Sequence, residues 1–210
     1  MLEINNLRKN FDNGTQALKG VSFKIKRGEF ISILGPSGSG KTTLLRSING
    51  LEPIENGEVI FNSNKITKDN LPDVQRKTGM IFQEFNLVNN LSSINNVLTG
   101  LLNSSSKFLS MFYLFNKEQK LEALQSLKTV GLLEKSYSRV DELSGGQRQR
   151  IGIARAIIKK PILLLKITSP FSIGSKPLIL LSNVVLPDPL GPKIEINSPL
   201  LTLKLTPFKA

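Results

Sequence analysis

The chain has 210 residues and a formal net charge of +12, from 28 Lys+Arg against 16 Asp+Glu. It contains no Cys, Trp or His, which excludes disulfides, Cys-ligated zinc, thiol nucleophiles and every catalytic scheme that uses imidazole. A hydrophobic fraction of 40% and a charged fraction of 21% are ordinary for a globular protein that buries a core. The N-terminus lacks the features of a signal peptide, and no apolar run approaches the roughly 20 residues of a membrane-spanning helix. We therefore expect a soluble, cytosolic chain.

The pattern of apolar residues predicts strands and helices through most of the chain. Predicted strands lie at 2–4, 21–25, 30–34, 57–61 and 79–83, with a turn at Asp12-Asn13-Gly14 between the first two. Predicted helices lie at 42–49, over 92–130 with a break at 103–106, and at 144–159, where Pro161 ends the last one. In the middle helical region, Leu121, Leu124 and Leu127 recur at helical spacing.

A phosphate-binding loop is predicted between the strand at 30–34 and the helix that follows it. Residues 35–43 fit the pattern G-x-x-x-x-G-K-[ST], whose glycines let backbone N–H groups converge on phosphate oxygens at a helix N-terminus. Lys41 supplies a compact charge to the β- and γ-phosphates, and the Thr42 hydroxyl can ligate Mg²⁺. The alternative, a glycine-rich turn that holds a lysine by chance, is disfavoured by the strand–loop–helix context. The candidate nucleotide-binding residues here are Gly35, Ser37, Gly38, Ser39, Gly40, Lys41, Thr42 and Thr43.

A second motif, Leu-Ser-Gly-Gly-Gln-Arg-Gln-Arg, covers residues 143–150 at the start of the last predicted helix. Ser144 is a good N-cap, and Gly145 and Gly146 leave backbone amides bare for an anion. By itself this is only a capped helix. Combined with the phosphate loop about a hundred residues earlier, it resembles the signature of ABC-type ATPases, and the resemblance covers residues 1–162.

The resemblance implies an α/β fold, the P-loop NTPase-type nucleotide-binding domain of ABC ATPases, with ATP and Mg²⁺ as cofactors. Gln83, in Phe-Gln-Glu, lies where that family has the Q-loop glutamine that reaches the Mg²⁺ and the attacking water. Phe11 lies where the family has an aromatic residue that stacks on adenine, although a lone aromatic suits a core equally well.

The resemblance also implies partners. In the family two such domains, identical or paralogous, dimerise head to tail, and the Ser144–Gln147 segment of one clamps ATP on the phosphate loop of the other. Membrane-spanning permease subunits complete the transporter, so the chain would lie at the cytoplasmic face of the cell membrane as a peripheral protein. Residues 50–57, 114–118 and 130–137 look most like the ATP-binding subunits of phosphonate importers, although importers of amino acids and lipoproteins share much of this pattern.

The family pattern stops near residue 162. After the signature helix the family has a short apolar strand and then Asp-Glu-Pro, the Asp ordering the Mg²⁺ shell and the Glu polarising the water. Here the strand begins at Pro161, but Lys166 and Ile167 stand where the acids of Walker B and catalysis belong. The switch histidine is also absent, and the next acids along the chain are Asp188 and Glu195. The resemblance therefore implies an ATPase domain truncated within this strand and defective in hydrolysis.

The tail, residues 163–210, holds seven of the eleven prolines, and no helix is predicted there. When each tail residue j is paired with residue 227−j, all seven prolines face all seven glycines of 17–64, and 47 of the 48 pairs obey the genetic code read from the opposite strand. The exception is Thr202, which would require Val where residue 25 is Ile. We therefore expect an unrelated, poorly ordered tail that is an antisense translation of a near-copy of the DNA encoding 17–64, produced by an inversion or a misassembled sequence.

Three other functions compete with a hydrolysis-defective importer subunit. One is a non-catalytic nucleotide-binding or dimerisation module that poisons an intact paralogue, and another is a gene remnant without activity. An ABC-type DNA-repair or chromosome ATPase is disfavoured, because the spacing of the two motifs leaves no room for a long coiled-coil insertion. Residues 1–162 carry +9 of the net charge, but no basic run with interleaved aromatic residues occurs, so no nucleic-acid partner is expected.

Overall fold

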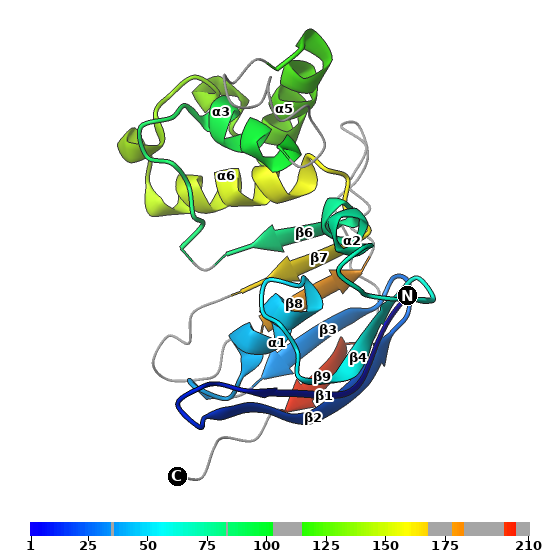
Figure 1. Ribbon diagram of the computed structural model, residues 1–210. Helices are drawn as coiled ribbons and strands as arrows, with labels where there is room; N and C mark the ends of the chain where they lie inside the picture. The colour runs from blue at the N-terminus through cyan, green and yellow to red at the C-terminus, as the bar shows by residue number, and fades with distance from the viewer. Residues whose placement is uncertain (35, 83, 103–114, 168–177, 183–199, 205–210) are drawn as a thin grey trace.

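The computed structural model describes residues 1–34, 36–82, 84–102, 115–167, 178–182 and 200–204 (Figure 1). Its N-terminal part is an antiparallel sheet with the strand order β2-β1-β4-β5. The strands are β1 (Leu2–Asn10), β2 (Gln16–Ile25), β4 (Asn56–Phe61) and β5 (Asn64–Lys65). The predicted turn between the first two is confirmed, since Phe11 N–H donates to Thr15 O and Gly14, at φ 79°, donates to Phe11 O.

A second sheet has the order β6-β7-β8-β3-β9. Its strands are β3 (Phe30–Leu34), β6 (Thr78–Ile81), β7 (Leu163–Lys166), β8 (Leu178–Ser182) and β9 (Leu200–Lys204). Strand β8 runs antiparallel to both β7 and β3, while β6 is parallel to β7 and β9 is parallel to β3. Strands β3 and β7 are therefore parallel to each other, and their carboxyl ends lie at the same edge.

The helices lie beside and between these sheets. They are α1 (Lys41–Ile48), α2 (Leu71–Lys77), α3 (Ser93–Leu98), η1 (Thr99–Leu101), α5 (Lys117–Thr129), η2 (Leu133–Lys135), η3 (Val140–Glu142) and α6 (Gly145–Ile157). Figure 1 shows α3, α5 and α6 gathered into a separate helical part beyond β6. Among the residues described, no helix is both long and apolar enough to cross a membrane.

Three hydrophobic clusters stabilise the described fold. The larger core packs α1 between the two sheets, with Leu44 and Leu45 of α1, Ile31 and Ile33 of β3 and Ile4 of β1 all inaccessible to solvent. Each such side chain contributes about 1.5–3 kcal/mol by leaving water. The second core lies within the helical part, and a small cluster of Ile81, Ala156 and Leu164 packs α6 onto the sheet. Strand β3, which leads into the phosphate loop, is therefore held in place by side chains that it buries in the larger core.

The predicted strands and helices that fall on described residues are confirmed, with shifts of a few residues at their ends. The residues around the predicted break at 103–106 lie outside the described part. Along α5, Leu127 is fully buried whereas Leu121 is 57% exposed, so the leucine spacing marks a helix but not a single buried face. Helix α2 was missed, although Asn70, Pro72 and Asp73 are ordinary signals of a helix start.

Of the tail, the structure describes residues 163–167, 178–182 and 200–204. The last two segments are β8 and β9, which pair with β3 on its two sides, so the backbone of the phosphate-loop strand is bonded to tail residues alone within its sheet. Figure 1 shows both strands, in orange and red, beside β3. The antisense origin of the tail and the low order of its remainder stay predictions.

Candidate functional site

The phosphate loop joins the end of β3 to the start of α1, as predicted. Gly38 and Gly40 have φ angles of 78° and 84°, in the left-handed region that favours glycine. A Cβ at Gly40 would lie 2.2 Å from the carbonyl oxygen of Ala17 on β2, whereas one at Gly38 would meet nothing within 4 Å. The loop is thus pressed against β2 at Gly40 and open at Gly38, and Gly35 lies outside the described residues.

Lys41 is the most enclosed charged group of this loop. Its side chain is 9% exposed, and its Nζ donates to Pro36 O at 2.5 Å and to Ser39 Oγ at 3.1 Å. Burial lowers the pKa of the Lys41 ammonium, because the charged form is partly removed from water. The loop backbone and Ser39 hold the ammonium where a phosphate approaching the loop would meet it.

Among the described residues of the cap and first turn, the N-terminus of α1 carries no compensating negative group. No side chain caps it, and its first turn contains no acidic residue. The first amides of a helix and its dipole together favour an anion at this position. Thr42 is exposed and Thr43 half-buried, so this end of the helix is accessible to a phosphate group.

Phe11 lies at the tip of the β1–β2 hairpin, whose second strand contacts the phosphate loop through Ala17. Its side chain is 36% exposed, and Lys9 Nζ lies 5.3 Å from the ring centroid. Lys9 is itself paired with Glu52 at 3.3 Å. The structure therefore places Phe11 on the hairpin that borders the loop, as an accessible aromatic ring backed by a lysine, and not in the core.

The signature segment begins α6 in the helical part, away from α1 (Figure 1). Gln147 N–H donates to Ser144 Oγ at 3.3 Å, and Ser144 N–H donates to Gln147 Oε1 at 2.9 Å, which is a complete capping box. Gly145 and Gly146 are exposed, and a Cβ on either would meet nothing within 4 Å. This segment is presented to solvent and satisfies its own helix start.

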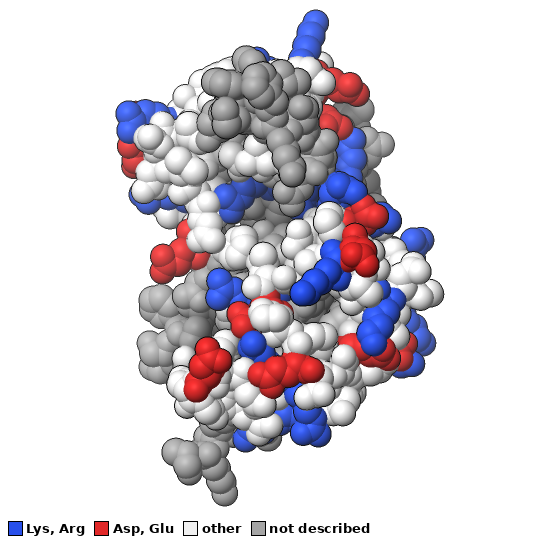
Figure 2. Space-filling view, viewed as in Figure 1, with Lys and Arg blue, Asp and Glu red and all other residues white. Residues whose placement is uncertain are grey.

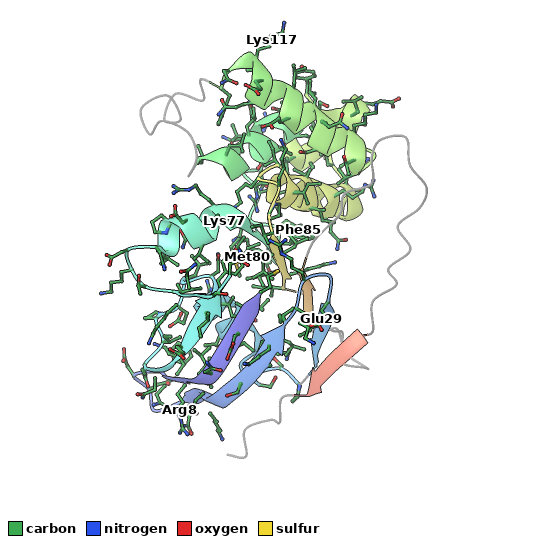
Figure 3. All side chains as sticks on the ribbon, turned by 90° about the vertical axis from the view of Figure 1, so that its right-hand side faces the viewer. Arg8, Glu29, Lys77, Met80, Phe85 and Lys117 are labelled. Atoms are coloured by element: carbon green, nitrogen blue, oxygen red, sulfur yellow. The ribbon has the colours of Figure 1, made fainter. Side chains whose placement is uncertain are left out.

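A cavity of about 380 Å³ lies between the sheets and the helical part. It is lined by Asn49, Leu51, Gln75, Thr78, Met80, Phe82, Asn86, Thr99, Gly100, Leu102, Arg155, Ala156 and Lys159. Figure 3 shows Met80 and Phe85 at this junction, with Lys117 at the far end of the helical part. Figure 2 shows both basic and acidic side chains on the surface around this junction.

Among the described residues, the lining of the cavity contains two cations and no acidic side chain. Arg155 donates to the backbone oxygens of Phe85 and Asn86, and Lys159 Nζ donates to Gln75 O at 2.8 Å. Burial lowers the pKa of both groups. Two buried polar atoms of the lining, Asn49 Oδ1 and Thr78 Oγ1, have no hydrogen-bond partner within the described protein.

Sequence reasoning did not single out this cavity. Its local signal in the sequence is the pair Arg155 and Lys159: Arg155 lies in the last turn of α6 and Lys159 two residues after its end, and both line the cavity. Arg155 also holds a strained backbone, because Phe85 and Asn86 have φ angles of 59° and 45°. Gln83, the predicted Q-loop glutamine, lies two residues before this strained segment and outside the described residues.

Comparison with known proteins decides the family. The family described as ABC transporter matches residues 18–166. This chain belongs to the ABC transporter family. The match ends at Lys166, so the ABC family pattern and this sequence separate within β7, as the sequence predicted.

Among curated ABC relatives, the phosphonates import ATP-binding protein PhnC of Lactobacillus delbrueckii subsp. bulgaricus is 47% identical over 168 residues, which are 79% of this chain and 66% of that protein. PhnC of Thiobacillus denitrificans is 46% identical over 164 residues, or 78% of this chain and 63% of that protein. The chain therefore spans just under two thirds of the length of these relatives.

Solved ABC structures agree with the fold. The ATP-binding cassette MJ0796, in a dimeric post-hydrolysis state bound to ADP and Pi, superposes with a TM-score of 0.66 and 35% identity, covering 79% of this chain and 73% of that one. The predicted α/β nucleotide-binding fold of ABC ATPases is confirmed.

The carboxyl end of β7 departs from what the ABC pattern would place there. Lys166 is half-buried, and Ile167 is 5% exposed and packs into the larger core. Within the described residues, no three His, Cys, Asp or Glu side chains are grouped as they would be around a metal ion. Near the phosphate loop, the exposed Thr42 hydroxyl is an oxygen that could bind a Mg²⁺.

Proposed function

We propose that this chain binds ATP at its phosphate loop and derives from the ATP-binding subunit of a phosphonate importer, which energises transport by ATP binding and hydrolysis in its intact form. The observation that carries the proposal is the pairing of the uncapped α1 N-terminus with the enclosed Lys41 ammonium. The identity of 46–47% to two PhnC proteins supports phosphonate as the substrate class.

The roles within the site follow from its geometry. Lys41 binds the β- and γ-phosphates, and the backbone of residues 35–40 together with Ser37, Ser39, Thr42 and Thr43 surrounds them. The adenine stacks on the open face of Phe11, because that hairpin borders the loop through Ala17. Gln83 acts as the Q-loop glutamine that reaches the Mg²⁺ and the water molecule, which is the role that its position in the sequence predicts.

We propose further that this chain does not hydrolyse ATP. Hydrolysis by such a site requires a group that activates the attacking water, and the end of β7 offers an ammonium and a buried isoleucine. The second candidate function, a non-catalytic nucleotide-binding or dimerisation module, rests on this same observation. It differs in that the chain would associate with an intact ATPase subunit through its Ser144–Gln147 segment.

The partners of the proposed subunit are a second ATPase domain and membrane-spanning permease subunits, at the cytoplasmic face of the membrane. The solved dimeric cassette bound to ADP and Pi supports a second ATPase domain as partner.

For the permease, we propose that one of its segments binds in the cavity between the sheets and the helical part. Within the part of the chain that the structure describes, Arg155 and Lys159 have no acidic partner in the lining, and Asn49 Oδ1 and Thr78 Oγ1 have no hydrogen bond, so a segment bearing a carboxylate and a backbone N–H would satisfy them.

The tail is proposed to be an antisense product that fills sheet positions next to β3. Reading Lys codons from the opposite strand yields Leu and Phe codons, so a lysine-rich region gives an apolar product that is able to pair as a strand. The nucleotide sequence of the locus tests this, because an inverted copy of the segment encoding 17–64 must lie at the 3′ end. A locus without that repeat contradicts it.

The test of nucleotide binding is a calorimetric titration of the whole chain with ATP, alongside Lys41→Ala and Lys117→Ala. Lys117 lies at the far end of the helical part, which makes it a matched loss of one lysine (Figure 3). We expect Lys41→Ala to weaken binding by about ten- to a hundredfold, as for loss of a hydrogen-bonded charge. Lys117→Ala should bind like the original chain. Equal affinity of all three would contradict the proposal.

A further inference from the structure

The hairpin that carries Phe11 is bonded, at the end of β1, to the segment that follows α1. The Glu55 carboxylate accepts two hydrogen bonds from Asn10, at 3.0 Å from its backbone N–H and at 2.8 Å from its side-chain amide. The Glu55 N–H in turn donates to Arg8 O at 3.2 Å. Asn10 immediately precedes Phe11, so these three bonds fix the backbone that carries the aromatic ring.

A second contact from the same segment reaches the ring itself. Lys9 Nζ lies 3.3 Å from a carboxylate oxygen of Glu52 and 5.3 Å from the centroid of the Phe11 ring, over which it is placed. The Lys9 and Glu52 side chains are only 11% and 22% exposed, so this pair is better shielded from water than an ordinary surface ion pair. An ammonium at this distance is attracted to the face of an aromatic ring. One face of Phe11 is thus backed by a cation that Glu52 holds, which leaves the opposite face for a base.

The segment that supplies both glutamates is fixed to the end of α1 by a Schellman motif. The Gly50 N–H, at a φ of 66°, donates to Ser47 O at 3.1 Å. The N–H groups of Leu51 and Glu52 both donate to Arg46 O, at 2.8 and 3.3 Å. The N-terminus of this same helix is the proposed phosphate site. Helix α1 therefore connects the proposed phosphate site at its start with the residues that hold the aromatic ring at its end.

We propose that Lys9, Glu52 and Glu55 are positioning residues for the base of the bound nucleotide. They act through Phe11, because Lys9 and Glu52 hold its ring from behind and Glu55 holds the backbone that precedes it. A ring that is fixed before binding stacks on a base without a further loss of conformational entropy. This inference rests on the proposed ATP binding and deepens it, since it concerns the base of the ligand and leaves the phosphates to Lys41.

The test compares the affinities of the whole chain for ATP and for inorganic triphosphate, which lacks the base and the ribose, both in Mg²⁺. Lys9→Met removes the cation at a similar side-chain length, and Glu55→Gln replaces one acceptor of the Asn10 contact by a donor. We expect each to weaken ATP binding about two- to tenfold and to leave the affinity for inorganic triphosphate nearly unchanged. Phe11→Ala, which removes the stacking altogether, should weaken ATP binding about five- to a hundredfold.

Matched variants distinguish positioning from a general loss of structure. Lys9→Arg keeps a cation over the ring and should bind ATP like the original chain. Glu58→Gln alters a similar carboxylate of β4, which accepts a hydrogen bond from Asn5 Nδ2 at 3.2 Å, six residues before Phe11 along the chain, and it should affect neither ligand. Lys9→Met combined with Phe11→Ala should bind ATP no more weakly than Phe11→Ala alone, because the lysine acts through the ring.

The outcomes separate this inference from the one it rests on. Unchanged ATP affinity in Lys9→Met and Glu55→Gln, with a loss in Phe11→Ala, overturns the positioning role and leaves ATP binding standing. Equal losses for ATP and inorganic triphosphate in Lys9→Met overturn it too, since the lysine would then act on the phosphates or on the whole fold. ATP binding that is undetectable, or indifferent to Lys41→Ala, overturns the proposed nucleotide site itself.

Discussion

The chain contains two glycine-rich helix starts, and they differ in how each treats its first backbone amides. At α1 no side chain caps the helix, the glycines at 38 and 40 adopt left-handed conformations, and the lysine that follows is enclosed. At α6 Ser144 and Gln147 cap the helix reciprocally, and the glycines at 145 and 146 are exposed. The first leaves its backbone amides available to the anion that we propose binds there, whereas the second is already satisfied by its own capping residues and its glycines are exposed.

The largest expected effect distinguishes the two glycines of the phosphate loop, Gly40 and Gly38. Gly40→Ala places a methyl group against the Ala17 carbonyl oxygen at a positive φ, so we expect the free energy of unfolding to fall by about 2–4 kcal/mol. Gly38→Ala is also at a positive φ but places its methyl group in open space, so it should lower the free energy of unfolding by only about 1 kcal/mol. Denaturant unfolding of both variants checks this, and an equal loss for the two would show that the contact with Ala17 is unimportant.

The second prediction is that a substitution at Lys41 weakens ATP binding without lowering the stability of the fold. Replacing the enclosed ammonium by an apolar side chain of similar length, Lys41→Met, removes a charge that burial disfavours, together with its bonds to Pro36 O and Ser39 Oγ. We expect the free energy of unfolding to stay the same or rise by up to about 1 kcal/mol, while ATP affinity falls about ten- to a hundredfold. Thermal unfolding and ATP titration measure the two effects, and a variant that loses both would mark Lys41 as a structural residue.

The third prediction concerns the capped helix start. Ser144→Ala removes the N-cap of α6 and should lower the free energy of unfolding by about 1 kcal/mol. Gly146→Ala, in open space, should leave it unchanged or raise it by up to about 1 kcal/mol. Neither should alter ATP affinity in the isolated chain. A loss of affinity in Ser144→Ala at protein concentrations where the chain is monomeric would contradict the separation of the two sites.

The smallest effect is a pH dependence. Burial lowers the pKa of Lys41 below its ordinary value near 10.5, so between the lowered pKa and 10.5 the unfolded state binds more protons than the folded state. The penalty for burying the charged form is complete below the lowered pKa and disappears as the pH rises through this window. ATP affinity should fall over the same window, because phosphate binding needs the ammonium. Titrations across the window should show this fall in the original chain and less of it in Lys41→Arg, which stays charged; identical profiles would contradict it.

Local signals explain what the sequence predicted well. The phosphate loop, the Ser144–Gln147 capping box and the turn at 12–14 each depend on residues within a few positions of one another, and all lie where the sequence predicts them. Lys166 and Ile167 were recognised because the ABC family pattern, which has two acidic residues after its apolar strand, ends there. Helix α2 had equally local start signals and was overlooked.

The features that escaped prediction depend on residues far apart in the sequence. Strand β8 enters between β3 and β7 from a segment more than a hundred residues after β3, and only the register of its pairs with Ser32 and Lys166 shows the relation between those two residues. The cavity likewise depends on how α6 packs against β6 and α2. Leu121 is exposed for the same reason. A helical repeat of leucines predicts a helix, but which of its faces is buried depends on neighbouring helices that are distant in the sequence.

We propose above all that this chain holds ATP at Lys41 and leaves it intact. The most direct measurement is to incubate the chain with ATP, in Mg²⁺ and in EDTA, and to separate the bound nucleotide and the released phosphate over time. We expect bound nucleotide to be recovered as ATP in both buffers, Lys41→Ala to retain almost none, and phosphate release to stay at the level of the buffer. Accumulation of ADP and phosphate at a rate that Lys41→Ala abolishes would contradict it.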